Sequence, residues 1–340
     1  MPFILTTCAV GSEAVLRRWM LEQHGWRSAF SRPGLVTYKV EQQVEADFSR
    51  PHPLMRTWGL SLGFCSSARD LERALGIAGQ PVLQVLPGEA GEKGHVPEKI
   101  LERWETEARR AQVEILTCWG ERVRLEQPAI GEAVLDVLVR PGEPWVLGWH
   151  RHSRERGPLP GGVWDLPIPE DAPSRSWAKL EELIRWSGVI PRKGESVLEI
   201  GCAPGGATVA MLDRGLRVCS VDPQPVVLPE RLQQAPFQQH RSLIEKLPRD
   251  KFPAAVDWIV VDMGVSAPMA VHALARIVPR YRQSLRGMFV TLKLNEWALV
   301  ERIPELLEKI EAMGFASVEA ACLPTFRQEI GVVARHQPAR

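Results

Sequence analysis

The sequence predicts an α/β protein whose C-terminal part is a doubly wound, mostly parallel sheet of Rossmann-like type, preceded by an α+β region. Strand and helix signals alternate from residue 196 to the end of the chain, as they do in such sheets. A glycine-rich turn follows the first of these strands, and residues 151–173 are rich in proline and glycine, which is typical of a linker. We therefore expect an N-terminal region over 1–150, a linker over 151–173 and a second domain over 174–340.

The N-terminal region has the less regular pattern. Its expected strands are Phe3–Val10, Leu35–Val40, Pro81–Leu86, Ala133–Val139 and Trp145–Trp149. Its expected helices are Glu13–His24 and Pro97–Arg110. Strands and helices mixed in this way predict an α+β fold. No catalytic constellation and no metal-ligand spacing stands out in this region.

The C-terminal region has short apolar runs separated by helical segments. Its expected strands are Ser196–Ile200, Leu216–Val221, Val256–Val261, Met288–Leu294, Ala316–Cys322 and Glu329–Ala334. Its expected helices are Gly206–Arg214, Ala267–Val278 and Glu301–Met313. Sheets of this class bind ligands at the carboxyl ends of their strands, so candidate site residues should lie at those ends.

Composition excludes several classes of protein. The chain has 340 residues, of which 45% are hydrophobic and 24% charged, ordinary values for a globular protein and not for a fibrous or disordered one. No apolar run reaches the ~18 residues of a membrane span, and the first residues do not form a secretory signal. Six scattered cysteines favour reduced thiols over disulfides or zinc. We expect a cytoplasmic protein without a metal site.

The net charge of +1 predicts no large positive field, so nucleic-acid binding would need local basic patches. The densest basic segment runs from Trp149 to Arg156. Its arginines suit phosphate contacts, and Trp149 or a histidine could stack on a base. A solvated basic loop is the plain alternative.

A glycine-rich turn from Glu199 to Gly206 follows the first strand of the C-terminal series. Glycines allow the backbone to approach a ligand closely, and the helix that follows offers free N–H groups. Asp222 ends the next strand, where a carboxylate reaches a ribose diol. The spacing differs from G-x-G-x-x-G, so a nicotinamide or flavin dehydrogenase is the weaker interpretation. A turn without any ligand is the structural alternative.

Four charged residues make a second signal. Asp262 and Lys293 end successive apolar strands, Glu329 begins the last strand, and Lys179 lies on a helix before the sheet. Three of them have simple explanations, as a solvated lysine, a helix cap and a surface glutamate. Lys293 is harder to explain, because a buried lysine without a partner is costly. Asp262, at the same edge of the sheet, would make it tolerable.

The turn and these four residues together resemble the RrmJ/FtsJ family of S-adenosylmethionine-dependent ribose 2'-O-methyltransferases, which carry a Lys-Asp-Lys-Glu tetrad in this order. The stretch 171–182 and the opening 8–13 are similar to the RlmM-type enzymes of this family, which methylate a cytidine of large-subunit (23S) ribosomal RNA. The resemblance covers nearly the whole chain and is weakest over 40–130. It implies an RNA-binding N-terminal region with a ferredoxin-like and a THUMP-like part.

The resemblance also implies site residues. The catalytic set is Lys179, Asp262, Lys293 and Glu329. The residues expected to bind S-adenosylmethionine are Ser174, Glu199, Gly201, Ala203, Pro204, Gly205, Gly206, Asp222 and Asp262. The basic segment, and not the resemblance, supplies Arg151, Arg154 and Arg156 as residues expected to bind RNA, and Arg175 joins them. One departure concerns 238–242, where many such enzymes place a carboxylate beside the adenine and this sequence has none.

For the reaction, we expect Lys293 to act as the base that removes the proton of the ribose hydroxyl. A neutral amine at pH 7 requires a pKa below the usual ~10.4, and burial together with nearby cations would lower it. Asp262 opposes that shift and would orient the amine. Lys179 and Glu329 would position the ribose and the ammonium group.

Two alternatives stay open. One is a non-catalytic RNA-binding or ribosome-assembly factor that retains the fold, favoured by the missing carboxylate. The other is a methyltransferase with another acceptor. Amino methylation usually follows an Asn/Asp-Pro-Pro-aromatic turn where this chain reads Asp-Met-Gly-Val at 262–265. Cytosine C5 methylation needs a nucleophilic cysteine, and neither Cys202 nor Cys322 is suitably placed.

Overall fold

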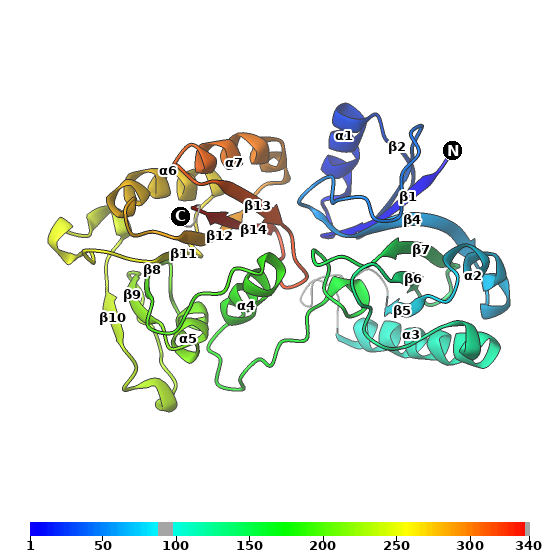
Figure 1. Cartoon of the computed structure of the whole chain (residues 1–340), viewed down its shortest axis with the longest axis horizontal. Helices are drawn as coiled ribbons and strands as arrows, with labels where there is room; N and C mark the ends of the chain where they lie inside the picture. Colours follow the sequence, from blue (N-terminus) through cyan, green and yellow to red (C-terminus); the bar gives the residue numbers. More distant parts are fainter. Residues whose placement is uncertain (88–97, 337–340) are drawn as a thin grey trace. The chain divides into compact units, whose positions relative to one another are not determined.

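The computed structural model describes residues 1–87 and 98–336, which divide into two compact units, Met1–Asp165 and Leu166–Arg340 (Figure 1). The division falls within the stretch 151–173 that the sequence marks as a linker. Each unit has its own sheet. Within the described ranges, no helix is long and apolar enough to cross a membrane.

The second unit is built on a mixed sheet with the strand order β10-β9-β8-β11-β12-β14-β13 in the described residues. The strands are β8 (Ser196–Ile200), β9 (Arg217–Val221), β10 (Phe237–His240), β11 (Trp258–Val261), β12 (Gly287–Lys293), β13 (Ser317–Ala321) and β14 (Glu329–Arg335). β8 to β12 pair in parallel, and β14 runs antiparallel to both of its neighbours. The order reverses between β8 and β11, and ligands bind at such a switch point in open α/β sheets.

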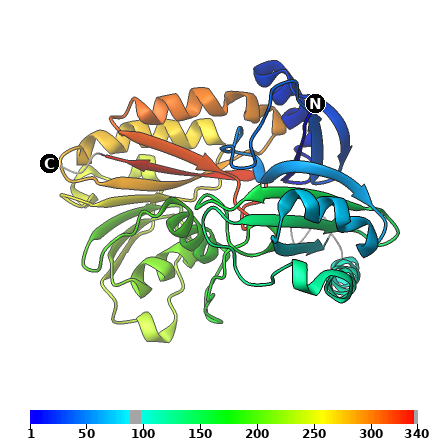
Figure 2. The ribbon, with the colours of Figure 1, turned by 45° about the vertical axis from the view of Figure 1, so that its right-hand side comes forward.

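Helices cover both faces of this sheet, with α4 and α5 on one face and α6 and α7 on the other (Figures 1 and 2). They are α4 (Ser176–Ser187), α5 (Gly206–Asp213), α6 (Ala267–Ile277) and α7 (Ile303–Glu311). In α6 the buried residues include Ala267, Ala270, Val271 and Leu274, the spacing of a helix with one apolar stripe. The doubly wound sheet predicted from the sequence is confirmed.

The first unit also contains one continuous sheet, with the described strands in the order β2-β3-β1-β4-β7-β6-β5. The strands are β1 (Phe3–Cys8), β2 (Arg27–Arg32), β3 (Leu35–Lys39), β4 (Met55–Cys65), β5 (Val82–Pro87), β6 (Ala133–Val139) and β7 (Trp145–Arg151). The helices are α1 (Glu13–His24), α2 (Glu72–Ala78) and α3 (Glu98–Trp119). The expected helix 97–110 therefore extends nine residues further, and its expected first residue lies outside the described residues.

The strand β4 joins what the resemblance treats as two parts. It pairs with β1 on one side and with β7 on the other, both antiparallel. The ferredoxin-like and THUMP-like parts that the resemblance implies would therefore share a sheet and could not be two separately folded bodies.

Close packing between α4 and β14 sets the position of the helix over the sheet. A Cβ added at Gly331 of β14 would overlap the Leu183 side chain of α4 and lie 2.9 Å from Cζ of Phe326. The helix can approach the strand this closely because residue 331 has no side chain.

We predict that Gly331→Ala destabilises the second unit by about 1–3 kcal/mol, because the methyl group overpacks this contact. Urea denaturation measures the change. Gly264→Ala is the matched control, since an added Cβ there meets nothing within 4 Å and should change stability by no more than about 0.5 kcal/mol. Equal stability of the two variants would show that α4 is not held by this contact.

Candidate active site

Four ionisable side chains meet at the carboxyl edge of the second sheet. The Lys179 Nζ lies 3.2 Å from Asp262 Oδ2 and 2.7 Å from Glu329 Oε1. The Lys293 Nζ lies 2.9 Å from Asp262 Oδ1 and also pairs with Glu329 Oε2. Each ammonium contacts both carboxylates, so the four groups close a ring of alternating charge, called the charge ring below.

Sheet topology explains why residues so distant in sequence meet. Asp262 directly follows β11, whose parallel neighbour β12 ends at Lys293. Since β14 runs antiparallel to β12, its first residue lies at the carboxyl end of β12, and Glu329 is the register partner of Lys293. Lys179 comes from α4, which packs on β14 through Leu183.

The charge ring is buried unevenly. Exposed fractions of the side chains are 7% for Lys179, 6% for Glu329 and 13% for Asp262, against 23% for Lys293. Lys293 is therefore the member that a substrate can reach most easily.

Electrostatics fix the charges of two members. Burial alone would raise the pKa of Asp262, but Lys179 and Lys293 outweigh it and hold this pKa below its usual value. Burial alone would lower the pKa of Lys293, but Asp262 and Glu329 outweigh it and raise this pKa above its usual value. The lowered pKa expected for Lys293 from the sequence is therefore wrong for the ligand-free protein, because its ammonium contacts two carboxylates.

Sequence reasoning missed one polar contact of the charge ring. The Ser176 hydroxyl donates to Asp262 Oδ2 at 2.8 Å. Ser176 begins α4 and precedes Lys179 by three residues, so both side chains lie on one face of the helix. This i, i+3 spacing was the available signal.

The glycine-rich turn lies against the loop that carries Asp262. Gly201 has a φ of 80°, and an added Cβ there would be 2.8 Å from the Asp262 carbonyl oxygen and from the backbone of Met263. A Cβ at Gly206 would overlap Ser174, whose hydroxyl accepts a hydrogen bond from the Ser176 N–H at 3.3 Å. Glycine is needed here for conformation and for space.

The two acidic residues near this turn differ in their surroundings. Asp222 follows β9 and accepts hydrogen bonds from the Ala203 N–H at 3.2 Å and the Gln224 N–H at 2.8 Å. Glu199 is buried, and its Oε2 accepts from the hydroxyls of Thr208 and Ser220, both at 2.6 Å. Burial raises the pKa of Glu199 to about 7.

These contacts correct the ligand-binding role expected for Glu199. Its carboxyl group is enclosed between β8, α5 and β9 and positions the turn from within. The half-buried Asp222 follows the carboxyl end of β9, with the backbone of Ala203 beside it.

The stretch 238–242 lacks a carboxylate, and its Gln239 side-chain amide contacts the loop that follows Asp222. The Gln239 Nε2 donates to the Gln224 carbonyl oxygen at 2.6 Å, and Oε1 accepts from the Val226 N–H at 3.0 Å. Gln239 thus holds the loop that follows Asp222. The sequence alone did not show that this loop is fixed from β10.

The four arginines expected to bind RNA have different environments. Arg151, Arg154 and Arg175 are exposed, and Arg151 also donates to the Gly131 carbonyl oxygen at 2.9 Å. Arg156 is buried. Its guanidinium lies 3.6 Å from the centre of the Trp58 ring and donates to the Trp58 carbonyl oxygen.

Burial lowers the pKa of Arg156 to about 9. A phosphate cannot reach a guanidinium enclosed in this way. The RNA-binding role expected for Arg156 is therefore wrong, and this side chain stabilises the first unit instead.

The second unit is similar to a known family of proteins. Residues 172–309 match the FtsJ-like methyltransferase family. This part of the chain is similar to FtsJ-like methyltransferase domains. The resemblance inferred from the tetrad and the glycine-rich turn is thereby confirmed.

In the described part of the chain, no group of three or more His, Cys, Asp or Glu side chains could hold a metal ion.

Curated relatives carry the name ribosomal RNA large subunit methyltransferase M. The one from Halorhodospira halophila is 32% identical over 188 residues, covering 53% of this chain and 52% of the relative. The one from Alkalilimnicola ehrlichii is 36% identical over 157 residues, covering 42% and 41%. The chain thus spans about half the length of the relatives it matches. The solved structure of TrmN from Thermus thermophilus is 18% identical and covers 98% of this chain and 100% of its own, with a TM-score of 0.34, too low to support a conclusion.

We predict that the charge ring shows strong energetic coupling. Lys179→Met and Glu329→Gln should each destabilise the second unit by about 3–5 kcal/mol, because each leaves a buried charge without its partner. The double variant keeps the Lys293–Asp262 pair balanced and should lose at least about 1 kcal/mol less than the sum of the two. Urea denaturation of all four proteins measures the coupling.

The control cycle uses Lys309 and Glu305, an exposed ion pair on α7. Water screens this pair, so its coupling should be much smaller. Additive effects of Lys179→Met and Glu329→Gln would contradict a ring of mutually dependent charges.

Proposed function

We propose that the second unit transfers a methyl group from S-adenosylmethionine to a ribose 2'-hydroxyl of large-subunit ribosomal RNA. The observation that carries the proposal is the closed charge ring beside a glycine-rich turn in a domain similar to FtsJ-like methyltransferases. The relatives named after large-subunit ribosomal RNA support the substrate class.

The residues at the switch point fit S-adenosylmethionine. The Asp222 carboxylate would hold the ribose diol, and the backbone from Gly201 to Gly206 would allow close approach of the ligand. Ser174 lies at the edge of this turn. Asp262 would contact the ligand from the loop against which Gly201 packs. When bound, this cofactor supplies an electrophilic methyl group.

Lys293 is the candidate base, because it is the most exposed member of the charge ring. Its raised pKa makes it an ammonium at neutral pH, so the amine must lose a proton before it accepts that of the hydroxyl. Asp262 and Glu329 would then stabilise the ammonium formed in the reaction. Lys179 would position these two carboxylates, which it contacts directly.

RNA would also contact exposed basic residues of both units. The exposed side chains of Arg151 and Arg154 in the first unit and of Arg175 in the second would contact phosphates. We propose an RNA-binding role for the first unit, with its ferredoxin-like and THUMP-like parts, and a cytoplasmic location.

We predict that Lys293→Ala and Lys293→Arg abolish ribose methylation while S-adenosylmethionine still binds. Alanine removes the base, and arginine keeps the charge but cannot lose a proton. Two measurements test this. One is the methylation of total RNA from a strain lacking the gene, and the other is calorimetry of S-adenosylmethionine binding. Lys309→Ala, an exposed lysine on α7, should retain activity.

Three outcomes separate the alternatives. Turnover by either Lys293 variant would remove Lys293 as the base. Absence of cofactor binding in the unmodified protein would favour a non-catalytic RNA-binding factor. Methyl groups found on a base instead of a ribose would identify another acceptor.

We predict that the single-turnover rate of methylation rises about tenfold per pH unit between pH 7 and pH 9. The fraction of neutral Lys293 increases by that factor as long as the pH stays below its pKa. RNA binding, measured separately at each pH, controls for changes in affinity. A flat profile would show that an already ionised carboxylate accepts the proton.

A further inference from the structure

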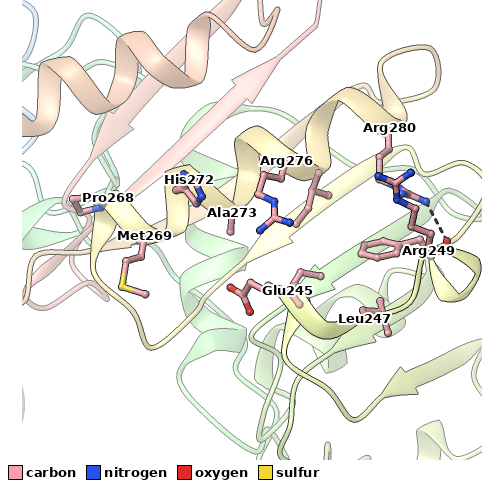
Figure 3. A pocket seen from close by; sticks show the side chains of 12 residues that line it. Glu245, Leu247, Arg249, Pro268, Met269, His272, Ala273, Arg276 and Arg280 are labelled. Atoms are coloured by element: carbon pink, nitrogen blue, oxygen red, sulfur yellow. Dashed lines mark hydrogen bonds between the residues drawn. The ribbon is translucent and has the colours of Figure 1, made fainter.

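A groove runs along α6 in the second unit, between this helix and the segment 244–252 that follows β10 (Figure 3). Its floor is apolar and includes Leu247, Phe252 and Ala273. Arginine side chains rise from both walls, with Arg276 from α6 and Arg249 from the facing segment. Neither the glycine-rich turn nor the charge ring contributes to this groove.

The groove is more basic than the chain as a whole. Its lining residues include three arginines and one glutamate, Glu245, with His272 taken as neutral. Their formal charge is therefore +2, against +1 for all 340 residues. No acidic residue occurs in the sequence between Asp262 and Glu296. The wall formed by α6 thus offers positive charge with no acidic neighbour along the chain.

The basic residues lie in a row on one face. His272, Arg276 and Arg280 are four residues apart along α6 and the 3-10 turn Val278–Tyr281 that continues it. Residues four apart in an α-helix are separated by slightly more than one turn, or ~6 Å along the axis. All three are exposed, and Figure 3 shows them following one another along the helix.

One of these arginines is held in place. The Arg280 guanidinium lies 4.6 Å from the centre of the Phe252 ring, and Nη2 donates to the Arg249 carbonyl oxygen at 3.2 Å. These two contacts fix the orientation of a side chain that is exposed. The Met269 side chain, 60% exposed, adds an apolar contact on the same wall.

The groove begins beside the charge ring. The residue before α6, Ser266, forms a parallel bridge with Lys293, and the groove starts two residues later at Pro268. A chain lying along α6 would therefore lead away from Lys293 toward Arg280.

We propose that this groove binds a single-stranded segment of the substrate RNA next to the nucleotide that is methylated. Arg249, Arg276 and Arg280 would contact phosphates, and Met269 would contact an unstacked base. Guanidinium groups bind phosphate through paired hydrogen bonds, and an apolar floor suits bases that are not paired in a duplex. This inference rests on the proposed function for the identity of the RNA.

The test replaces the three arginines by glutamine, singly and together, and measures binding of a 30-nucleotide oligocytidine at several salt concentrations. Each lost phosphate contact on a single strand reduces the slope of log K against log salt by about 0.7, so the triple variant should lose about 2. Arg282→Gln is the matched control, because Arg282 is exposed and lines a different hollow.

Methylation kinetics give the second readout. The triple variant should have a KM for RNA raised at least about tenfold, with the single-turnover rate at saturating RNA and the KM for S-adenosylmethionine unchanged. Single variants should show intermediate effects, which keeps the test decisive if the triple variant does not fold. A photoreactive residue in place of Met269 should cross-link to the oligocytidine.

The outcomes separate this inference from the proposed function. An unchanged salt slope and an unchanged KM for RNA in an active, folded triple variant would overturn the groove as an RNA site. If the unmodified protein methylates no RNA while its oligocytidine binding still depends on the three arginines, the proposed function fails and the groove stands. If each single variant in the groove loses only as much affinity as Arg282→Gln, the losses reflect general surface charge. That result would also overturn the inference.

Discussion

Four charges, two of them buried and two half-buried, share one site in this protein because each ammonium contacts two carboxylates and each carboxylate contacts two ammonium groups. Removing such groups from water costs several kcal/mol for each ion, and only close contacts between opposite charges offset this. The ring has no net charge, so the low-dielectric edge of the sheet tolerates it. The same contacts give Lys293 a fixed position and a high affinity for its proton, which is the chemical starting point for any reaction at this edge.

The direction of one strand makes the charge ring possible. Because β14 enters the sheet antiparallel, Glu329 at its beginning is placed across from Lys293 at the end of β12. A parallel last strand would put its first residue at the opposite edge of the sheet. The absence of a side chain at Gly331 then lets α4 approach β14, and Lys179 completes the ring from above the strand.

Much of the fold could be predicted from the sequence, because short apolar runs that alternate with helical segments are typical of buried parallel strands. The strand 196–200 and the helix 13–24 have the predicted bounds. The strands that prediction missed have other compositions. β2 and β10 are polar edge strands with little burial. β4 contains Gly59, where an added Cβ would lie 2.6 Å from the Trp149 carbonyl oxygen, and glycine normally argues against a strand.

The site was predictable to a different degree. The tetrad order and the carboxyl-end rule together pointed to one edge of the sheet, and the structure brings the four side chains together there. The pKa direction of Lys293 was not predictable, because it depends on how many carboxylates contact the amine. Arg156 was mistaken for a surface residue because its partner Trp58 is 98 residues away in the sequence. The roles of these residues stay proposals.

The shared strand β4 has a consequence for anyone who wishes to study the first unit in pieces. Cutting the chain on either side of β4 would leave a long strand with a row of unpaired backbone N–H and C=O groups, since β4 is hydrogen-bonded along both edges. Exposed edges of this kind recruit other chains and lead to aggregation. A soluble fragment therefore has to keep all the strands of this sheet, from one edge at β2 to the other at β5.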